Sequence, residues 1–399
     1  MPKKADTFQS ADNKDLLLYP PTTYTADMDK TGDSDKVVLR AQDLDEYLTD
    51  ADRSLVQEMD GLYKEALETM NVLDNAPNEP RQQRARQQLI DQYQRMGDRM
   101  QEVIAAEPRV RVYSFQTPRA VHGEASRLIA KLRDTRTSQS EFMYYIQRAY
   151  ELLFNLAYAE PDNHHKNHLI VRTPVTDPVQ NFAVHKIPDV DDALENTVMC
   201  VMLRGALLPS MIMSKEIQEY TSTAYVTPFA LFRISRDDTK MESNMEYILD
   251  LDRSYFELDS LDGKDLIFAD PMNATGGSLV TIIQYLHSQG IHPRSVCFFN
   301  VISALKGSLR IVRAIENATV YTLWMDPVLN DVAYILPGLG DAGDRLNGTD
   351  TEEAPRNIIQ LIADYGSSVS NLYRSQVREI EQTVLGHVAG RRRKRSSGI

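Results

Sequence analysis

Hydrophobic and polar residues alternate along this chain with a period that changes from region to region. Between residues 50 and 106, apolar residues recur at the three- and four-residue steps of amphipathic helices. Asn75-Ala-Pro-Asn-Glu-Pro80 interrupts this pattern, so the stretch predicts a hairpin of two helices. Residues 1–42, by contrast, are polar and contain Pro20-Pro21, and we interpret them as an irregular arm.

The central part of the chain consists of short apolar runs separated by segments of helical periodicity. Helices are expected over about 118–133 and 138–160, after a short strand within 110–115. Further helices are expected at 279–288 and 308–316. The expected strands are Val198–Leu203, Thr223–Phe232, Leu266–Ala269, Ser295–Ser303 and Thr319–Met325. Strands that alternate with helices indicate crossover connections, so we expect an α/β fold with a mainly parallel sheet.

The C-terminal part has helical periodicity and then a basic block. A periodic segment from Pro355 to about Val388 predicts one long helix that leads into Arg391-Arg-Arg-Lys-Arg395. We interpret this block as a disordered tail, and binding to an anionic surface or partner is the alternative. The patterns divide the chain into an arm (1–42), a helical extension (43–108), a central domain (109–349), a C-terminal helix (350–390) and a basic tail (391–399).

Composition narrows the class of protein. The 399 residues are 42% hydrophobic and 25% charged, which is typical of a globular protein. No apolar run reaches the about 18 residues of a membrane span, and the N-terminus lacks the apolar core of a secretory signal. Cys200 and Cys297 lie in apolar runs and are interpreted as buried thiols of a reducing compartment, so we expect a cytoplasmic protein. The net charge of −13 argues against a nucleic-acid partner.

The most informative stretch is a loop between an expected strand and an expected helix. It consists of Asp270, Pro271, Met272, Asn273, Ala274, Thr275, Gly276, Gly277 and Ser278, and we call residues 270–278 the phosphate loop. Free backbone N–H groups and the helix dipole favour an anion at a helix N-terminus. Its glycines allow close approach, and the preceding carboxylate can accept hydrogen bonds from sugar hydroxyls. The stretch therefore predicts a phosphorylated sugar as ligand, and a plain strand–helix turn is the alternative.

Two further stretches could complete such a site. Residues 334–345, which we call the glycine loop, read Tyr-Ile-Leu-Pro-Gly-Leu-Gly-Asp-Ala-Gly-Asp-Arg and cannot form a regular element. Their backbone groups could bind a small flat molecule, although a tight surface loop is the alternative. In Met202-Leu203-Arg204-Gly205-Ala206, an arginine follows a strand end, where its guanidinium could neutralise a diphosphate or simply lie on the surface.

Together these three stretches resemble the uracil phosphoribosyltransferases, a branch of the type I phosphoribosyltransferases. The family patterns Asp-Pro-Met-x-Ala-Thr-Gly-Gly-Ser and Tyr-Ile-x-Pro-Gly-Leu-Gly-Asp-Ala-Gly-Asp-Arg are met at 270–278 and 334–345. The family's Leu-Arg-Ala-Gly is similar to residues 203–206. The helical segments that follow residue 109 match the family more loosely, and with them the resemblance covers about residues 109–349. It implies a type I phosphoribosyltransferase fold, a parallel sheet flanked by helices, to which this chain adds its N-terminal helical hairpin and its C-terminal helix.

The resemblance also implies roles for individual residues. The phosphate loop would hold the ribose hydroxyls and 5-phosphate of phosphoribosyl diphosphate, and Arg204 would face the diphosphate. A second arginine would help there, and either Arg233 or Arg236 matches its position. The residues expected around uracil are Tyr334, Ile335, Gly340, Asp341 and Ala342. Asp341 would also lie near the magnesium waters, and no side chain is expected to bind the metal directly.

The implied reaction converts uracil and phosphoribosyl diphosphate, with Mg²⁺, into UMP and diphosphate in pyrimidine salvage. Arg204 and Asp341 would be the catalytic residues. The alternative is a non-catalytic or altered-base relative that senses phosphoribosyl diphosphate or a nucleotide and signals through its helical extensions. A homo-oligomer, dimer or tetramer, and a nucleotide effector are expected. Two departures from the family pattern stand out: Asn347 replaces an aromatic residue, and the connection before Asp270 is longer.

Overall fold

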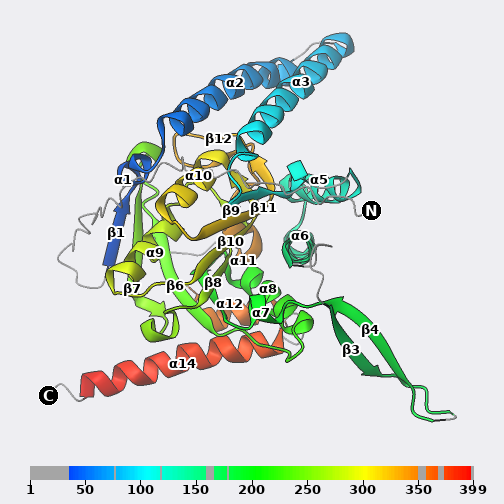
Figure 1. The fold of residues 1–399 in the computed structure, drawn as a ribbon. Coiled ribbons are helices and arrows are strands. Elements are labelled where there is room, and N and C mark those ends of the chain that lie inside the picture. The colour runs from blue at the N-terminus through cyan, green and yellow to red at the C-terminus, as the bar shows by residue number, and fades with distance from the viewer. Residues whose placement is uncertain are drawn as a thin grey trace, which may run out of the picture.

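A mostly parallel sheet lies at the centre of the computed structural model (Figure 1). The structure describes residues 36–75, 78–116, 119–158, 166–177, 179–348, 356–366 and 373–396. The strands of the sheet are β1 (Lys36–Arg40), β2 (Val110–Val112), β5 (Thr197–Leu203), β6 (Phe229–Arg236), β7 (Glu246–Tyr255), β8 (Asp265–Ala269), β9 (Met272–Asn273), β10 (Ser295–Ala304) and β11 (Ala318–Asp326). In the described part of the chain the order is β1-β7-β6-β5-β8-β10-β11-β2, with β9 beside β10.

Parallel pairing dominates this sheet and confirms the predicted α/β class. Strands β6, β5, β8, β10, β11 and β2 pair in parallel, whereas β7 pairs antiparallel with β6 and with β1. The parallel strands β5, β8 and β10 have near-continuous buried runs, as expected for strands covered on both faces. The carboxyl ends of these strands therefore share one edge, where α/β proteins bind their ligands.

Helices cover the sheet and form the two extensions. The helices of the central region are α4 (Tyr113–Gln116), α5 (Arg119–Arg133), α6 (Gln139–Tyr158), α7 (Asp191–Leu194), α8 (Leu207–Tyr220), α9 (Gly277–Ser288), α10 (Leu305–Ala314) and α11 (Ala342–Asn347). Those outside it are α1 (Ala41–Glu46), α2 (Asp50–Asn75), α3 (Glu79–Ile104), α12 (Ile358–Asp364) and α14 (Arg374–Ser396). The predicted helical hairpin is confirmed as α2 and α3, with Met59 and Met96 among its buried residues.

Some elements lie where the sequence pattern did not place them. The strand expected over Thr223–Phe232 is in fact β6, Phe229–Arg236. Proline lacks the N–H group that a ladder requires, so Pro228 marks the point after which the strand can begin. Strand β7 and the ribbon of β3 (Lys166–Arg172) and β4 (Phe182–Pro188) were not predicted. This ribbon projects from the body, as does the far end of the α2–α3 hairpin (Figure 1).

The irregular arm predicted for residues 1–42 is wrong at its C-terminal end. Residues 36–40 form β1, and α1 begins at Ala41. Strand β1 pairs with β7 from Lys36 opposite Asp250 to Arg40 opposite Glu246. Strand β1 lies at the edge of the sheet and depends on pairing with a strand that is distant in sequence, which the local pattern cannot reveal. Residues 1–35 lie outside the described residues.

The single helix predicted from Pro355 to about Val388 is also wrong. The chain forms α12 and α14 instead. Gly366, just after α12, has a φ of +82°, the left-handed conformation that commonly ends helices. The backbone of the basic block 391–395 belongs to α14, so the prediction of a disordered tail is wrong as far as Ser396.

The fold gives no sign of a bilayer-crossing segment: none of the described helices is both long and apolar enough to span a membrane. Cys200 and Cys297 are free thiols, the first buried and the second partly buried.

Candidate functional site

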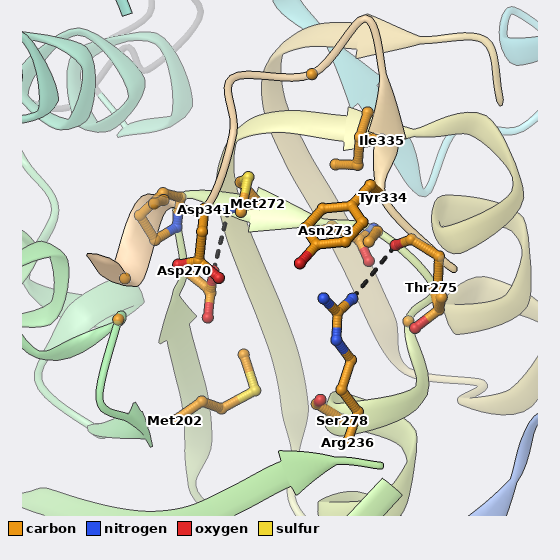
Figure 2. Close-up of a pocket in the computed structure, with 18 of the residues that line it drawn as sticks. Met202, Arg236, Asp270, Met272, Asn273, Thr275, Ser278, Tyr334, Ile335 and Asp341 are labelled. Carbon is orange, nitrogen blue, oxygen red and sulfur yellow. Dashed lines mark hydrogen bonds between the residues drawn. The ribbon is translucent and has the colours of Figure 1, made fainter. Parts of the chain in front are cut away.

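A cavity of about 510 Å³ opens at the carboxyl ends of the parallel strands. It is lined by the phosphate loop after β8, by Arg204 and Gly205 after β5, by the end of β6 and by most of the glycine loop. These segments are far apart in the sequence, and Figure 2 shows them facing one another around the cavity. The fold therefore brings together the three stretches that the sequence singled out.

Backbone and side-chain groups of β10 hold the phosphate loop in place. The backbone N–H of Asp270 donates to the carbonyl of Phe299 (3.1 Å), and the Asn300 amide donates to the carbonyl of Asp270 (2.9 Å). Further along, the Asn273 amide donates to the Ser303 hydroxyl (2.7 Å). The loop is thus fixed to the neighbouring strand before α9 begins.

Glycines are required where the loop turns into α9. Gly276 has a φ of +76°, which a residue with a side chain adopts at a cost. A Cβ atom on Gly277 would overlap the ring of Tyr247, a buried residue of β7. The start of α9 is therefore pressed against β7, with its free backbone N–H groups at the loop.

The Asp270 carboxyl group lies in an environment that disfavours its charge. Burial is the main cause that raises the pKa of Asp270 to about 7; the nearby charge of Asp341 acts in the same direction, and a hydrogen bond from the Met272 N–H (3.0 Å) opposes the shift. Figure 2 shows Asp270 and Asp341 close together on one side of the cavity. A carboxyl group with such a pKa is a candidate for a functional role.

Arg204 connects the loop after β5 to the end of the glycine loop. Its guanidinium donates to the carboxylate of Asp344 (2.6 Å) and to the carbonyl of Gly348 (2.7 Å). The peptide bond that precedes Arg204 is cis. Although Arg204 lines the cavity, its guanidinium is anchored to these neighbours.

Of the two arginines that the sequence left open, Arg236 lines the cavity and Arg233 does not. The Arg236 guanidinium donates to the carbonyl of Ala333 (3.3 Å), pairs with Asp238 (2.8 Å) and lies 5.0 Å from the centroid of the Tyr334 ring. Figure 2 shows the guanidinium pointing toward this ring. The position of Arg236, two residues beyond Ile234 at the strand end, provides the second cation of the site.

The glycine loop is supported by one buried carboxylate, which pairs with an arginine, and by a helix cap. Asp326, at the end of β11, accepts a hydrogen bond from the Gly338 N–H (3.1 Å) and pairs with Arg133 of α5 (2.5 Å). Asp341 caps α11 by accepting a hydrogen bond from the Asp344 N–H (2.9 Å). The loop is consequently rigid enough to present its backbone groups to a ligand.

The C-terminal extension explains the unusual Asn347. Asn347 is buried, and its side-chain oxygen accepts a hydrogen bond from the Tyr365 hydroxyl (2.8 Å). Arg356 donates to the carbonyl of Asn347 (2.5 Å) and more weakly to that of Gly348 (3.3 Å), which also accepts from Arg204. Tyr365, just beyond α12, thus joins the C-terminal extension to the end of the glycine loop through Asn347.

Most of the predicted site residues line the cavity, and the exceptions are Gly277, which packs under Tyr247, and Arg233. The sequence analysis missed Tyr247 and the partnership of Arg204 with Asp344. Tyr247 belongs to the alternating pattern of Met245, Tyr247 and Leu249, all buried, which could have revealed β7. No local pattern pairs Arg204 with Asp344, because they are distant in sequence.

Comparison with known proteins gives the family. The family model described as uracil phosphoribosyltransferase matches residues 121–349. A uracil phosphoribosyltransferase of Dictyoglomus thermophilum is 31% identical over 225 residues, which are 55% of this chain and 93% of that protein. One from Clostridioides difficile is 43% identical over 86 residues, 22% of this chain and 40% of that protein.

Solved structures also match. A protein of Aquifex aeolicus is 23% identical, with a TM-score of 0.41, over 57% of this chain and 96% of that one. The orotate phosphoribosyltransferase of Mycobacterium tuberculosis, solved with phosphoribosyl diphosphate, is 13% identical with a TM-score of 0.28, over 54% of this chain and 94% of that one. Because the family model covers more than half of the chain, the protein belongs to the uracil phosphoribosyltransferase family.

Proposed function

We propose that the protein transfers ribose 5-phosphate from phosphoribosyl diphosphate to uracil. Family membership makes phosphoribosyl transfer the class of reaction. The observation that supports uracil as the base is that one cavity joins the phosphate loop, Arg236 and the glycine loop at the carboxyl ends of the sheet. In this reaction a ring nitrogen of uracil bonds to the anomeric carbon, the bond to diphosphate breaks, and the nitrogen's proton leaves to solvent.

The residues of the cavity can be given roles in this reaction. Backbone N–H groups at the N-terminus of α9 would bind the 5-phosphate, and Asp270 would accept hydrogen bonds from the ribose hydroxyls. Arg204 and Arg236 would stabilise negative charge that develops on the diphosphate. Backbone groups of Ile335 and of residues 340–342 would read the edges of uracil, next to Tyr334.

The site suits a magnesium ion that binds mainly through the diphosphate of the substrate. Within the described residues, no group of three or more histidine, cysteine or acidic side chains gathers that could hold a metal ion. Mg²⁺ usually keeps several waters and binds through one or two carboxylates together with substrate phosphates. We propose that waters of a diphosphate-bound Mg²⁺ lie near Asp341 and that the ion neutralises the leaving group. Homo-oligomerisation, a nucleotide effector and the domain boundaries stay predictions.

The full chain, incubated with labelled phosphoribosyl diphosphate and Mg²⁺, should produce labelled UMP when uracil is added. Cytosine, orotate and adenine are the comparison bases, and a reaction without base measures hydrolysis. A different preferred base would contradict the assignment of uracil. Binding of phosphoribosyl diphosphate with no nucleotide formed from any base would contradict catalysis and favour the sensing alternative.

The raised pKa of Asp270 predicts that substrate binding depends on pH near neutrality. The ionised carboxylate is the better acceptor for ribose hydroxyls, so the affinity for phosphoribosyl diphosphate should increase as pH rises through about 7. Below that value it should fall by up to about tenfold per pH unit. Calorimetric titrations between about pH 5.5 and 8.5, corrected for ionisation of the ligand, would measure this change.

Asp270→Asn provides the matched variant for this prediction. It should bind more weakly at pH 8 and lose the Asp270 step in the pH profile. Because the folded-state pKa is raised above the unfolded value, ionisation of Asp270 costs stability as pH rises from the ordinary value of 3.8 to about 7, and the loss is complete above that. The ligand-free Asn variant should therefore melt at a higher temperature than the wild type at pH 8. An identical pH profile in both proteins would rule out Asp270 as the titrating group.

A further inference from the structure

Helix α10 supports the phosphate loop from behind through backbone contact. A Cβ atom on Gly307, in the first turn of α10, would overlap the carbonyl oxygen of Ala274. Conversely, a Cβ atom on Gly276 would approach the carbonyl oxygen of Gly307 to 2.8 Å. Because close-packed backbones transmit displacement, whatever fixes α10 also fixes this loop.

Arg310 connects α10 to both the loop and the N-terminal extension. Its side chain is fully buried and donates a long hydrogen bond to the carbonyl of Thr275 (3.4 Å). The same guanidinium binds Asp45 of α1 (2.6 Å) and lies 2.9 Å from a carboxylate oxygen of Glu242. A buried guanidinium requires such partners, because an unpaired charge in the interior is strongly destabilising.

These two carboxylates come from different parts of the chain. Asp45 precedes the matched region 121–349, whereas Glu242 lies within it, on the connection between Arg236 and Asp270. Lys306, also on α10, completes the cluster by binding Glu242 (2.9 Å). The N-terminal extension and the connection before Asp270 therefore meet at one buried arginine that contacts the phosphate loop.

We propose that Arg310 is a positioning residue through which the N-terminal extension sets the phosphate loop for phosphoribosyl diphosphate; this inference rests on the proposed function. The carbonyl of Thr275 and the N–H of Gly276 belong to one peptide plane and point in opposite directions. Because Arg310 donates to the Thr275 carbonyl from the side of α10, this carbonyl points toward α10 and the N–H of Gly276 points toward the cavity. Asp45 holds Arg310 in the position from which it does so.

The same helix offers a matched control. Arg313, one turn beyond Arg310, binds Asp52 of α2 (2.9 Å) and also Glu107. This ion pair likewise joins the N-terminal extension to α10, but its hydrogen-bond partners lie outside the phosphate loop. Asp45 and Asp52 therefore differ in whether their arginine reaches the loop.

The test compares Asp45→Asn with Asp52→Asn in the full chain. Asp45→Asn should raise the KM for phosphoribosyl diphosphate about tenfold, equivalent to about 1.4 kcal/mol, and leave the KM for uracil unchanged. Asp52→Asn should lower the melting temperature by a similar amount as Asp45→Asn without changing either KM. Arg310→Lys retains the charge but lacks the fork that spans Asp45 and Thr275, so its KM should shift as for Asp45→Asn.

The outcomes separate this inference from the proposed function. Calorimetric titration of the wild type with phosphoribosyl diphosphate, together with the UMP assay, establishes the function first. If the wild type neither binds this substrate nor forms UMP, both proposals are wrong. If the wild type is active and Asp45→Asn has an unchanged KM, or both Asn variants raise it equally, the positioning role alone is wrong.

Discussion

Arg204→Ala is expected to lower kcat for UMP formation by about 10²–10³-fold, the usual cost of removing one group that stabilises developing charge. The substitution removes a cation from the cavity wall and, at the same time, the bonds to Asp344 and Gly348 that join two loops of the site. Steady-state rates at saturating uracil and phosphoribosyl diphosphate would measure the loss.

Two variants distinguish the charge of Arg204 from its bonds. Asp344→Asn keeps the cation and removes only its ion pair, so it should cost less than Arg204→Ala. Arg233→Ala, near Arg204 in the sheet but outside the lining of the cavity, should leave kcat within about twofold, as is usual for substitutions away from a site. A wild-type rate for Arg204→Ala would exclude its catalytic role, and equal losses for Arg204→Ala and Asp344→Asn would assign it to loop anchoring.

Gly277→Ala is expected to weaken substrate binding strongly, although it adds only one methyl group. The new Cβ would overlap the ring of Tyr247, a buried residue of β7, so either this ring or the start of α9 must shift. Overpacking of this kind typically costs about 1–3 kcal/mol of stability. A displacement of the phosphate loop by about 1 Å should weaken productive binding of phosphoribosyl diphosphate by about 10²-fold. Calorimetric titration and thermal unfolding would measure the two effects.

A second glycine serves as the control for Gly277. Gly97, within α3, has no atom near the position of a Cβ, so Gly97→Ala should raise stability by about 0.5–1 kcal/mol and leave binding unchanged. Replacing Tyr247 with leucine in the Gly277→Ala background should restore part of the binding by making space. Tight binding by Gly277→Ala alone would show that the loop does not depend on this contact.

The sequence predicted those parts of the site that are local. The phosphate loop lies in one continuous strand–loop–helix unit, whose buried strand, glycines and helix periodicity are all visible within a short stretch. The glycine loop is equally continuous. Each could be identified because the residues that determine its conformation are its own neighbours.

What the sequence could not predict depends on residues brought together by folding. Strand β1 exists because β7 lies beside it, and the choice of Arg236 over Arg233 follows from which side chain the end of β6 turns toward the cavity. The partnership of Asn347 with Tyr365 joins residues separated by a helix boundary. In each case the local pattern is compatible with more than one outcome, and tertiary contact decides between them.

The hydrogen bond between Tyr365 and Asn347 has a consequence for any attempt to shorten the protein. Removal of the segment that contains Tyr365 would leave the buried side-chain oxygen of Asn347 without its hydroxyl partner, and an unsatisfied buried polar group costs free energy of folding. The C-terminal extension is therefore part of what keeps the end of the glycine loop folded, and it is not a detachable appendage.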